Sequence, residues 1–97
     1  MVLMYVTVVP NPEHMDDLAA YSEASGALLK GAGGEVITRA RVTGSIHGNP
    51  AAPMFMVMRF SSEERIRAVF ESDAYKTLIP RRERAFQALS ISLVEEF

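Results

Sequence analysis

The sequence predicts an α+β fold in which strands and helices follow the order β-α-β-β-α-β. Three observations lead to this prediction: a nearly all-apolar segment at 3–9, a glycine-rich segment at 31–34 after a helical pattern, and a second apolar segment at 54–60. Continuous apolar runs of this length are typical of strands covered on both faces, and glycine is frequent where a helix ends. The 97 residues are expected to form one domain, 1–97.

The N-terminal third of the chain predicts the first strand and the first helix. Residues 3–9 contain one polar side chain, Thr7, which indicates a central strand. Asn11 can cap a helix and Pro12 suits its first position, so a helix is predicted from there to about Lys30. The residues expected on its apolar stripe are Met15, Leu18, Tyr21 or Ser22, Leu28 and Leu29.

A hairpin with a long loop is predicted next. Residues 35–43 have the pattern of a second strand and 54–60 that of a third, and Gly48-Asn49-Pro50 marks the loop between them. Strict alternation along the second strand predicts one basic face and one small, apolar face. Ile37, Arg39, Arg41 and Thr43 are expected on the first face, and Val36, Thr38, Ala40 and Val42 on the second.

A second helix is predicted to begin after Ser61 or Ser62, because either hydroxyl can cap it. The residues expected on its buried side are Ile66, Val69 and Phe70. A break near 72–73 restarts the helix, and Pro80 should kink or divide it, since proline removes an internal hydrogen bond. The residues at helical spacing after the break are Tyr75, Leu78, Ile79, Arg82 and Phe86.

Residues 90–97 predict a final strand with Ile91, Leu93 and Phe97 on one side. Together the elements have the order of a ferredoxin-like sandwich, in which an antiparallel four-stranded sheet carries both helices on one face. The first and third strands are apolar on both faces, so the helix-free face of the sheet also needs a cover. In so short a chain the simplest cover is a second copy, and a homodimer is predicted.

Composition and charge limit the expected partners. A net charge of −2 and a pI near 5.6 provide no basic field for nucleic acid. No positive charge precedes the first apolar segment and Pro10 ends it, so neither a signal peptide nor a membrane span is expected. The chain has no cysteine, which excludes disulfides and cysteine nucleophiles and fits a reducing compartment, so a cytoplasmic location is expected.

The sequence has no motif for a metal or a cofactor. The two histidines, His14 and His47, lie on different predicted elements without His-x-x-His spacing. The glycines at 31–34 lack the lysine of a phosphate-binding loop and follow a helix, and neither a dinucleotide fingerprint nor a serine elbow occurs. We therefore expect no bound metal and no cofactor.

Arg59 is the most unusual charge in the chain, because it stands in an otherwise apolar strand. A guanidinium in that place must form an ion pair, reach solvent or face a ligand. It either pairs across the sheet or a dimer interface, or binds a carboxylate or enolate in a cleft between sheet and helices with Arg39 or Arg41. The sequence leaves both interpretations open.

The other candidate residues have two interpretations as well. His47 is either a general base at a pocket mouth or an exposed loop residue. The phenols of Tyr21 and Tyr75, on the apolar sides of the helices, either point into the same cleft or form local hydrogen bonds. The run Arg81 to Arg84 is either an anion site or a solvated, ion-paired helix face. The candidates are thus Arg59, His47 and Tyr75 for catalysis, and Tyr21, Arg39, Arg59, Tyr75 and Arg82 for a ligand pocket.

Several short segments, in this order, resemble the domain of unknown function 1330 family. That family lies in the dimeric α+β barrel superfamily, together with small monooxygenases and muconolactone-isomerase-like proteins. The similar segments are the first strand, Gly33-Gly34, Phe60-Ser61, Ser72-Asp73-Ala74-Tyr75, which is similar to a Ser-x-x-Tyr pattern, and Arg81 or Arg82. The resemblance covers nearly the whole chain and implies the ferredoxin-like fold and a dimer, without a settled activity.

The chain departs from the family pattern at three positions. Ala32 stands where members often have a histidine before the double glycine. Arg59 stands where they often have a glutamate before the phenylalanine of the third strand, and His47 where a glutamate precedes the loop glycine. Any activity of this chain would be decided at these positions.

Three functions are compatible with the sequence. The first is a small dimer that binds an apolar or aromatic acid in a cleft between sheet and helices, and it is favoured because no catalytic constellation is visible. The second is a cofactor-free monooxygenase- or isomerase-like enzyme, in which Arg59, His47 or a tyrosine handles charge or protons. The third is a protein-interaction module. A pocket on which these side chains converge would favour the enzyme, and an ion-paired Arg59 would favour the other two.

Overall fold

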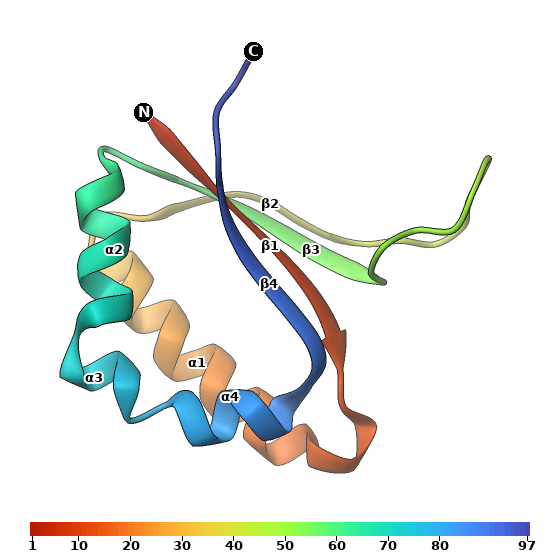
Figure 1. The fold of residues 1–97 in the computed structure, drawn as a ribbon, viewed down its shortest axis with the longest axis horizontal. Helices are drawn as coiled ribbons and strands as arrows, with labels where there is room; N and C mark the ends of the chain where they lie inside the picture. The colour runs from red at the N-terminus through yellow and green to blue at the C-terminus, as the bar shows by residue number, and fades with distance from the viewer.

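Four antiparallel strands form one sheet in the order β2-β3-β1-β4, and the helices pack on one of its faces (Figure 1). The computed structural model describes all residues from Met1 to Phe97. The elements are β1 (Val2–Pro10), the 3-10 turn η1 (Pro12–His14), α1 (Met15–Gly31), β2 (Glu35–Arg41), β3 (Met54–Phe60), α2 (Glu63–Glu71), α3 (Asp73–Lys76), α4 (Ile79–Ala85) and β4 (Phe86–Val94). This arrangement confirms the predicted ferredoxin-like α+β fold.

The hydrophobic core lies between the sheet and the helices α1 and α2. In the register of the two central strands, Met4 and Val6 of β1 lie opposite Met58 and Met56 of β3. The buried side chains of the core cluster are Met4, Val6, Leu29, Met58, Phe60, Ile66 and Val69. Burial of one large aliphatic side chain contributes about 1.5–3 kcal/mol, so this cluster holds the helices on the sheet.

The connection from α1 to β2 requires glycine at two positions. Gly33 has φ = +92°, in the left-handed region that side chains other than glycine rarely adopt. A Cβ atom on Gly34 would lie 2.5 Å from the ring of Phe60 and 2.8 Å from the carbonyl oxygen of Leu29. The glycine-rich segment therefore ends α1 as predicted, and it also lets the start of β2 pass close to the core.

The predicted caps are present at the helix starts. The Asn11 carboxamide oxygen accepts a hydrogen bond from the N–H two residues later, at 3.1 Å. Of the two serines expected to cap the second helix, Ser62 does so, since its Oγ accepts from the Arg65 N–H at 3.4 Å. Ser72 Oγ accepts from the Tyr75 N–H at 3.2 Å and starts α3. This third cap sets the position of the Tyr75 side chain.

Two expectations about the helices had different outcomes. Pro80 divides the segment after Ser72 as predicted and lies in the first turn of α4. Met15 was expected on the buried stripe of the first helix, and this prediction is wrong, because its side chain is 52% exposed. Met15 is the first residue of α1, whereas the buried residues of that helix are Tyr21, Ser25 and Leu29.

No helix of the structure combines the length and apolar character that crossing a membrane requires.

The final strand begins earlier than predicted. β4 starts at Phe86, which the spacing had placed on a helix, and ends at Val94. Phe97, expected on the same strand, lies beyond it with a fully exposed side chain. The reason is that β1 offers a pairing partner over residues 3–10, and β4 pairs along all of this length. Strand pairing outweighs the local helical spacing here.

β2 is an edge strand whose alternation is interrupted by a bulge. Its register shifts between Val36 and Thr38, so that Val36 lies opposite Met58 and Arg39 lies opposite Met56. Val36 and Arg39 therefore share the side of the sheet that carries the helices. The prediction that placed them on opposite faces is wrong, because one inserted residue reverses the alternation.

The other face of the sheet carries no helix. Leu3 and Tyr5 of β1 lie opposite Arg59 and Val57 on this face. The ring of Tyr5 is 6.1 Å from that of Phe55, and the Tyr5 side chain is 37% exposed. This helix-free face is thus mainly apolar along its two central strands.

Candidate functional site

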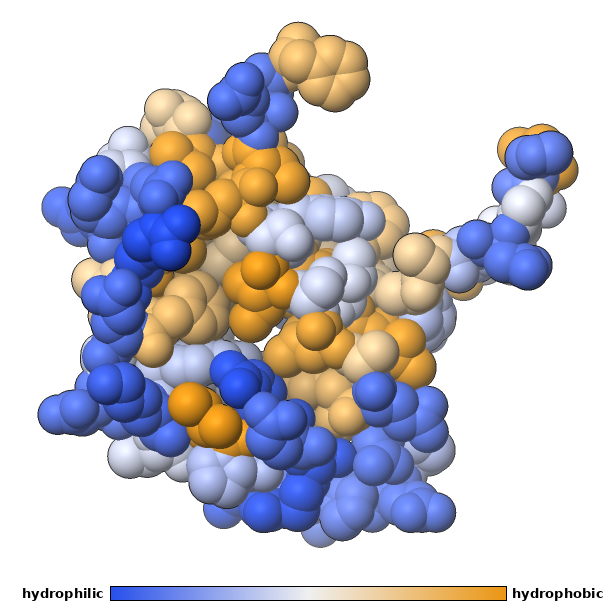
Figure 2. Space-filling model, viewed as in Figure 1, coloured by the Kyte–Doolittle hydropathy of each residue, from blue (hydrophilic) through white to orange (hydrophobic).

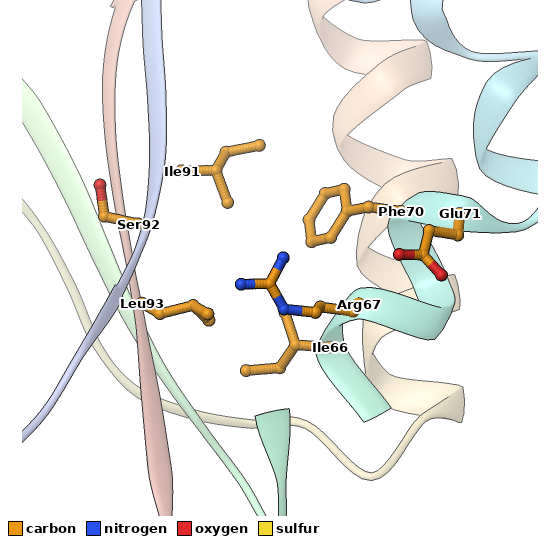
Figure 3. Close-up of a pocket in the computed structure, with 7 residues that line it drawn as sticks. All are labelled: Ile66, Arg67, Phe70, Glu71, Ile91, Ser92 and Leu93. Atoms are coloured by element: carbon orange, nitrogen blue, oxygen red, sulfur yellow. The ribbon is translucent and has the colours of Figure 1, made fainter. Parts of the chain in front are cut away.

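A cleft of about 610 Å³ lies between α2 and β4 (Figure 3). Figure 3 shows Ile66 and Phe70 pointing across this cleft toward Ile91 and Leu93, with the guanidinium of Arg67 between them. The residues that line the cleft are Ile66, Arg67, Phe70 and Glu71 of α2, and Ile91, Ser92 and Leu93 of β4. Its walls are therefore mostly apolar, and α2 brings one cation and one carboxylate to it.

A second hollow of about 260 Å³ lies between α4 and the first half of β4. Its lining residues are Arg82, Glu83, Phe86, Gln87, Ala88, Leu89 and Ile91. Because Ile91 lines both hollows, they adjoin along β4. Figure 2 shows this face of the molecule, on which apolar side chains gather over β4 and strongly hydrophilic side chains lie over the helices. We call the two hollows together the β4 groove.

The phenols of Tyr21 and Tyr75 form a hydrogen bond behind the β4 groove, with their oxygens 2.7 Å apart. The Arg82 Nη1–H donates to the Tyr75 oxygen at 3.1 Å, and the guanidinium carbon lies 5.8 Å from the centre of the Tyr75 ring. Both rings pack edge-on against groove residues, Phe70 against Tyr75 at 4.7 Å and Phe86 against Tyr21 at 5.6 Å between centroids. The tyrosine pair thus supports both walls of the groove.

The surroundings of Tyr21 and Arg82 keep each of these two groups in one protonation state near neutral pH. Burial, and next the hydrogen bond with the Tyr75 phenol, raise the pKa of Tyr21 well above its usual range. Hydrogen bonds to Glu83 and then to Tyr75 raise the pKa of Arg82 further above its already high value. Tyr21 is therefore a neutral phenol and Arg82 a permanent cation.

The two arginines of the groove differ in how firmly they are held. Arg67 is paired with Glu63 one turn earlier, at 2.6 Å, and its side chain is 59% exposed. Arg82 is paired with Glu83 at 2.8 Å, and its side chain is only 27% exposed. Arg82 alone is also bonded to a buried phenol, so its guanidinium has the more fixed position.

Asp17 positions α4 against α1. The Arg84 Nε–H donates to one oxygen of its carboxylate at 2.9 Å, and Arg81 lies 3.3 Å from the other. The imidazole of His14 is 3.4 Å from the same carboxylate. Hydrogen bonding to Arg84 is the main cause that lowers the pKa of Asp17. Within the arginine run, Arg81 and Arg84 therefore form ion pairs within the chain.

Three of the five residues predicted to line a ligand pocket come together, namely Tyr21, Tyr75 and Arg82. Arg59 does not join them. It lies opposite Leu3 on the helix-free face, where its Nη2 is 3.5 Å from a carboxylate oxygen of Glu35. Its Nε is buried without a hydrogen-bond partner. The ion-pair interpretation of Arg59 thus agrees with its place in the sheet, and the cleft interpretation does not.

Arg39 and His47 also lie away from the β4 groove. Arg39 stands on β2, the edge strand opposite β4, with β3 and β1 between them. His47 is exposed in the loop that joins β2 to β3, and this loop projects from the body of the molecule (Figure 1). No group of three or more histidine, aspartate or glutamate side chains is arranged to hold a metal ion.

Sequence reasoning did not identify Arg67 as a residue of the site. Its neighbours Ile66 and Phe70 were expected on the buried side of the helix, and Ile91 and Leu93 on one side of the last strand. The sequence pattern does not give the distance between the apolar residues of α2 and those of β4. The cleft exists because α2 stands apart from β4, and no local sequence signal reports such a separation.

Comparison with known proteins places the chain in a family. Residues 4–97 match the family described as domain of unknown function (DUF1330). No protein with a curated description matches the sequence.

Several solved structures have the same fold. A protein of unknown function from Rhodopseudomonas palustris is similar with a TM-score of 0.83 and 15% identity, covering 99% of this chain and 82% of that one. An ethyl tert-butyl ether D family protein from Bacillus halodurans has a TM-score of 0.63 and 17% identity, with both chains covered completely. A provisionally named antibiotic biosynthesis monooxygenase from Nitrosomonas europaea has a TM-score of 0.67 and 7% identity, covering 99% of this chain and 98% of that one. With the family match over nearly its whole length, the chain belongs to the DUF1330 family.

Proposed function

We propose that this protein is a homodimer that binds a small apolar or aromatic carboxylic acid in the cleft between the sheet and the helices. The observation that carries the proposal is the Arg82 guanidinium at a hollow that Phe86 and Leu89 also line, held in place by the buried phenol of Tyr75. The absence of cysteine supports a cytoplasmic setting.

Arg82 has the properties of an anion anchor. Its planar guanidinium matches the two oxygens of a carboxylate, and such charge-assisted hydrogen bonds are among the strongest in proteins. The bond to Tyr75 leaves fewer positions for the side chain, so less entropy is lost when a ligand binds. Its present partner Glu83 is 68% exposed, and exposed ion pairs contribute about 0–1 kcal/mol. A ligand carboxylate can therefore replace that of Glu83.

The apolar part of the ligand has suitable partners next to Arg82. Phe86, Leu89 and Ile91 line the same hollow, and Ile91 continues into the larger cleft. The larger cleft lies within the range of about 300–1,000 Å³ that is usual for small-molecule sites.

Binding is better supported than cofactor-free catalysis. The enzyme hypothesis needs Arg59, His47 or a tyrosine at the cleft, and the first two lie elsewhere. Tyr75 is 1% exposed behind Phe70, so its phenol does not reach a ligand in the groove. Tyr75 acts instead as a positioning residue for Arg82.

The homodimer is supported by the helix-free face of the sheet. This face carries Leu3, Tyr5, Phe55 and Val57 along its central strands, and no element of the chain covers it. Large exposed apolar patches usually mark contact sites. The ion pair of Arg59 and Glu35 lies on the same face, where a second copy would shield it from solvent.

Calorimetric titration with phenylacetate and its neutral analogue phenylacetamide tests the binding proposal. We expect the acid to bind and the amide to bind at least tenfold more weakly, because a charged hydrogen bond is worth about 1.5–3 kcal/mol. Arg82→Gln should weaken binding of the acid roughly 10- to 100-fold. Arg39→Gln is the matched control, since it removes the same charge from an exposed strand on the far edge of the sheet. Equal binding of acid and amide, or an Arg82→Gln variant that binds as well as the wild type, would refute the proposal.

A further inference from the structure

We infer that the ligand of the β4 groove is an elongated acid, whose carboxylate pairs with Arg82 and whose apolar chain runs along β4 past Ile91 into the cleft beside α2. This inference rests on the proposed function and specifies its ligand class. It selects a straight alkyl or arylalkyl carboxylate over a compact aromatic acid.

The first argument is the shape of the groove. The small hollow at Arg82 and the larger cleft at Arg67 share Ile91 and no other residue, so they form two consecutive parts of one groove. Leu89 and Leu93 lie two positions to either side of Ile91 and therefore on the same face of β4. The distance from Leu89 to Leu93 along an extended strand is about 13 Å. A compact ring at Arg82 would leave the larger cleft empty, whereas an extended chain fills both.

The second argument is the incomplete burial of this apolar row. Leu89, Ile91 and Leu93 lie opposite Val8, Val6 and Met4 of the central strand, on the side of the sheet that carries the core. Yet Leu93 is 36% exposed, whereas Met4 is completely buried. The helices cover the central strands and leave the helix-facing side of β4 open, so β4 offers a continuous apolar strip to a ligand.

The third argument fixes the orientation of the ligand. Arg67 stands between two glutamates of its own helix, Glu63 one turn before it and Glu71 one turn after it. A ligand carboxylate at Arg67 would meet both of these negative charges. Arg82 has only one carboxylate neighbour, besides the Tyr75 hydroxyl, so the carboxylate end of the ligand is better placed there.

The length of the ligand can be tested with a series of straight-chain acids from butanoate to dodecanoate, kept below their micelle concentrations. Each methylene that enters the groove should tighten binding roughly fourfold, because this factor corresponds to the transfer free energy of one buried CH₂. We expect this gain to continue as the chain extends past Ile91 and to stop once it passes Leu93. Affinity that does not change along the series would overturn the inference, even if phenylacetate binds with the Arg82 dependence that supports the proposed function.

Two pairs of variants test the path and the orientation. Leu93→Ala should weaken dodecanoate about tenfold and leave butanoate unchanged, because only the long chain reaches that side chain. Val94→Ala is the matched control, since its side chain lies on the other face of β4. Arg82→Gln should weaken every acid of the series by the same factor, and by a larger factor than Arg67→Gln does. Dependence on Arg67 in place of Arg82, or equal loss for butanoate and dodecanoate in Leu93→Ala, would overturn the inference.

Discussion

The hydroxyl oxygens of Tyr21 and Tyr75 lie 2.7 Å apart, although 54 residues separate the two positions in the chain. Both side chains are nearly inaccessible to solvent, with 6% and 1% exposed. Since Arg82 donates a hydrogen bond to the Tyr75 oxygen, residues of α1, α3 and α4 meet at one point. This meeting point connects the helix layer to the Arg82 end of the groove.

Tyr75→Phe is expected to lower the free energy of unfolding by about 1–3 kcal/mol. The substitution leaves the buried hydroxyl of Tyr21 and one N–H of Arg82 without their partner, and such unpaired groups cost this amount. Urea denaturation measures the change. The same variant should bind phenylacetate less tightly, because Arg82 loses the partner that positions it. The difference in affinity between long and short acids should stay the same.

A double-mutant cycle then isolates the pair. Tyr21→Phe together with Tyr75→Phe should cost less than the two single changes added, because the double variant leaves no unpaired phenol. Additive losses would mean that the two hydroxyls do not stabilise the fold through their contact.

Gly34→Ala is expected to destabilise the fold by about 1–3 kcal/mol, since its Cβ would lie 2.5 Å from the ring of the fully buried Phe60. Gly26→Ala is the matched control, because that position in α1 has no heavy atom within 4 Å of the added Cβ. The control should gain about 0.5–1 kcal/mol from the higher helix propensity of alanine. Thermal unfolding of the two variants should thus shift in opposite directions, and a shift of both in the same direction would contradict this account.

The Asp17 ion pairs should make stability depend on pH in the acid range. Arg84, mainly through its hydrogen bond, lowers the pKa of Asp17 below its usual value of 3.8. A lowered folded-state pKa means that the stabilisation is fully present above the unfolded-state pKa and is lost as the pH falls through the folded-state value. Asp17→Asn should therefore be less stable than the wild type at neutral pH, and the difference should shrink below about pH 4.

Urea denaturation from pH 7 down to pH 2 measures this difference. Asp16→Asn is a suitable control. Asp16 is exposed, and this variant removes a similar charge next to Asp17 without removing the arginine contacts. A wild-type advantage over Asp17→Asn that stays constant across the acid range would show that the ion pairs do not contribute.

Sedimentation tests the proposed homodimer. The wild-type chain is expected to sediment at micromolar concentration with about twice its mass of 10.7 kDa. Tyr5→Glu should yield the single chain, because it places a charge in the middle of the helix-free face. Met15→Glu, on an exposed helical position, should not change the mass. A wild-type mass near 10.7 kDa would exclude the dimer.

The fold could be predicted from local patterns, because each pattern reports the burial of its own segment. The apolar run at 3–9, the caps at Asn11 and Ser62, the break near 72–73 and the glycines before β2 each predicted a feature that is present. The predictions failed where a distant partner changes the local preference. Pairing with β1 draws Phe86 into a strand, and a bulge in β2 turns Val36 and Arg39 to the same face.

The candidate site could be predicted only in part. Tyr75 and Arg82 could be named as candidates, because their spacing of seven residues places both on one side of a predicted helix. The separation of Arg59 from these two residues could not be predicted, since it depends on which face of the sheet the helices cover. Arg67 could not be predicted as a residue of the site, because the sequence pattern of an amphipathic helix is the same whether its charged side chain faces solvent or a groove.

The amino-acid sequence alone determined the order of strands and helices and the glycine and proline residues that separate them. Those features depend on backbone preferences and on periodicity within a few residues. Which side chains meet depended on the packing of the whole chain. Tyr21 and Tyr75 share a hydrogen bond because α1 and α3 pack on the same face of the sheet. Arg59 is excluded from their site because the register of β3 turns its side chain to the helix-free face. Contacts between remote segments depend on register and helix placement, and neither is encoded in any short stretch of the chain.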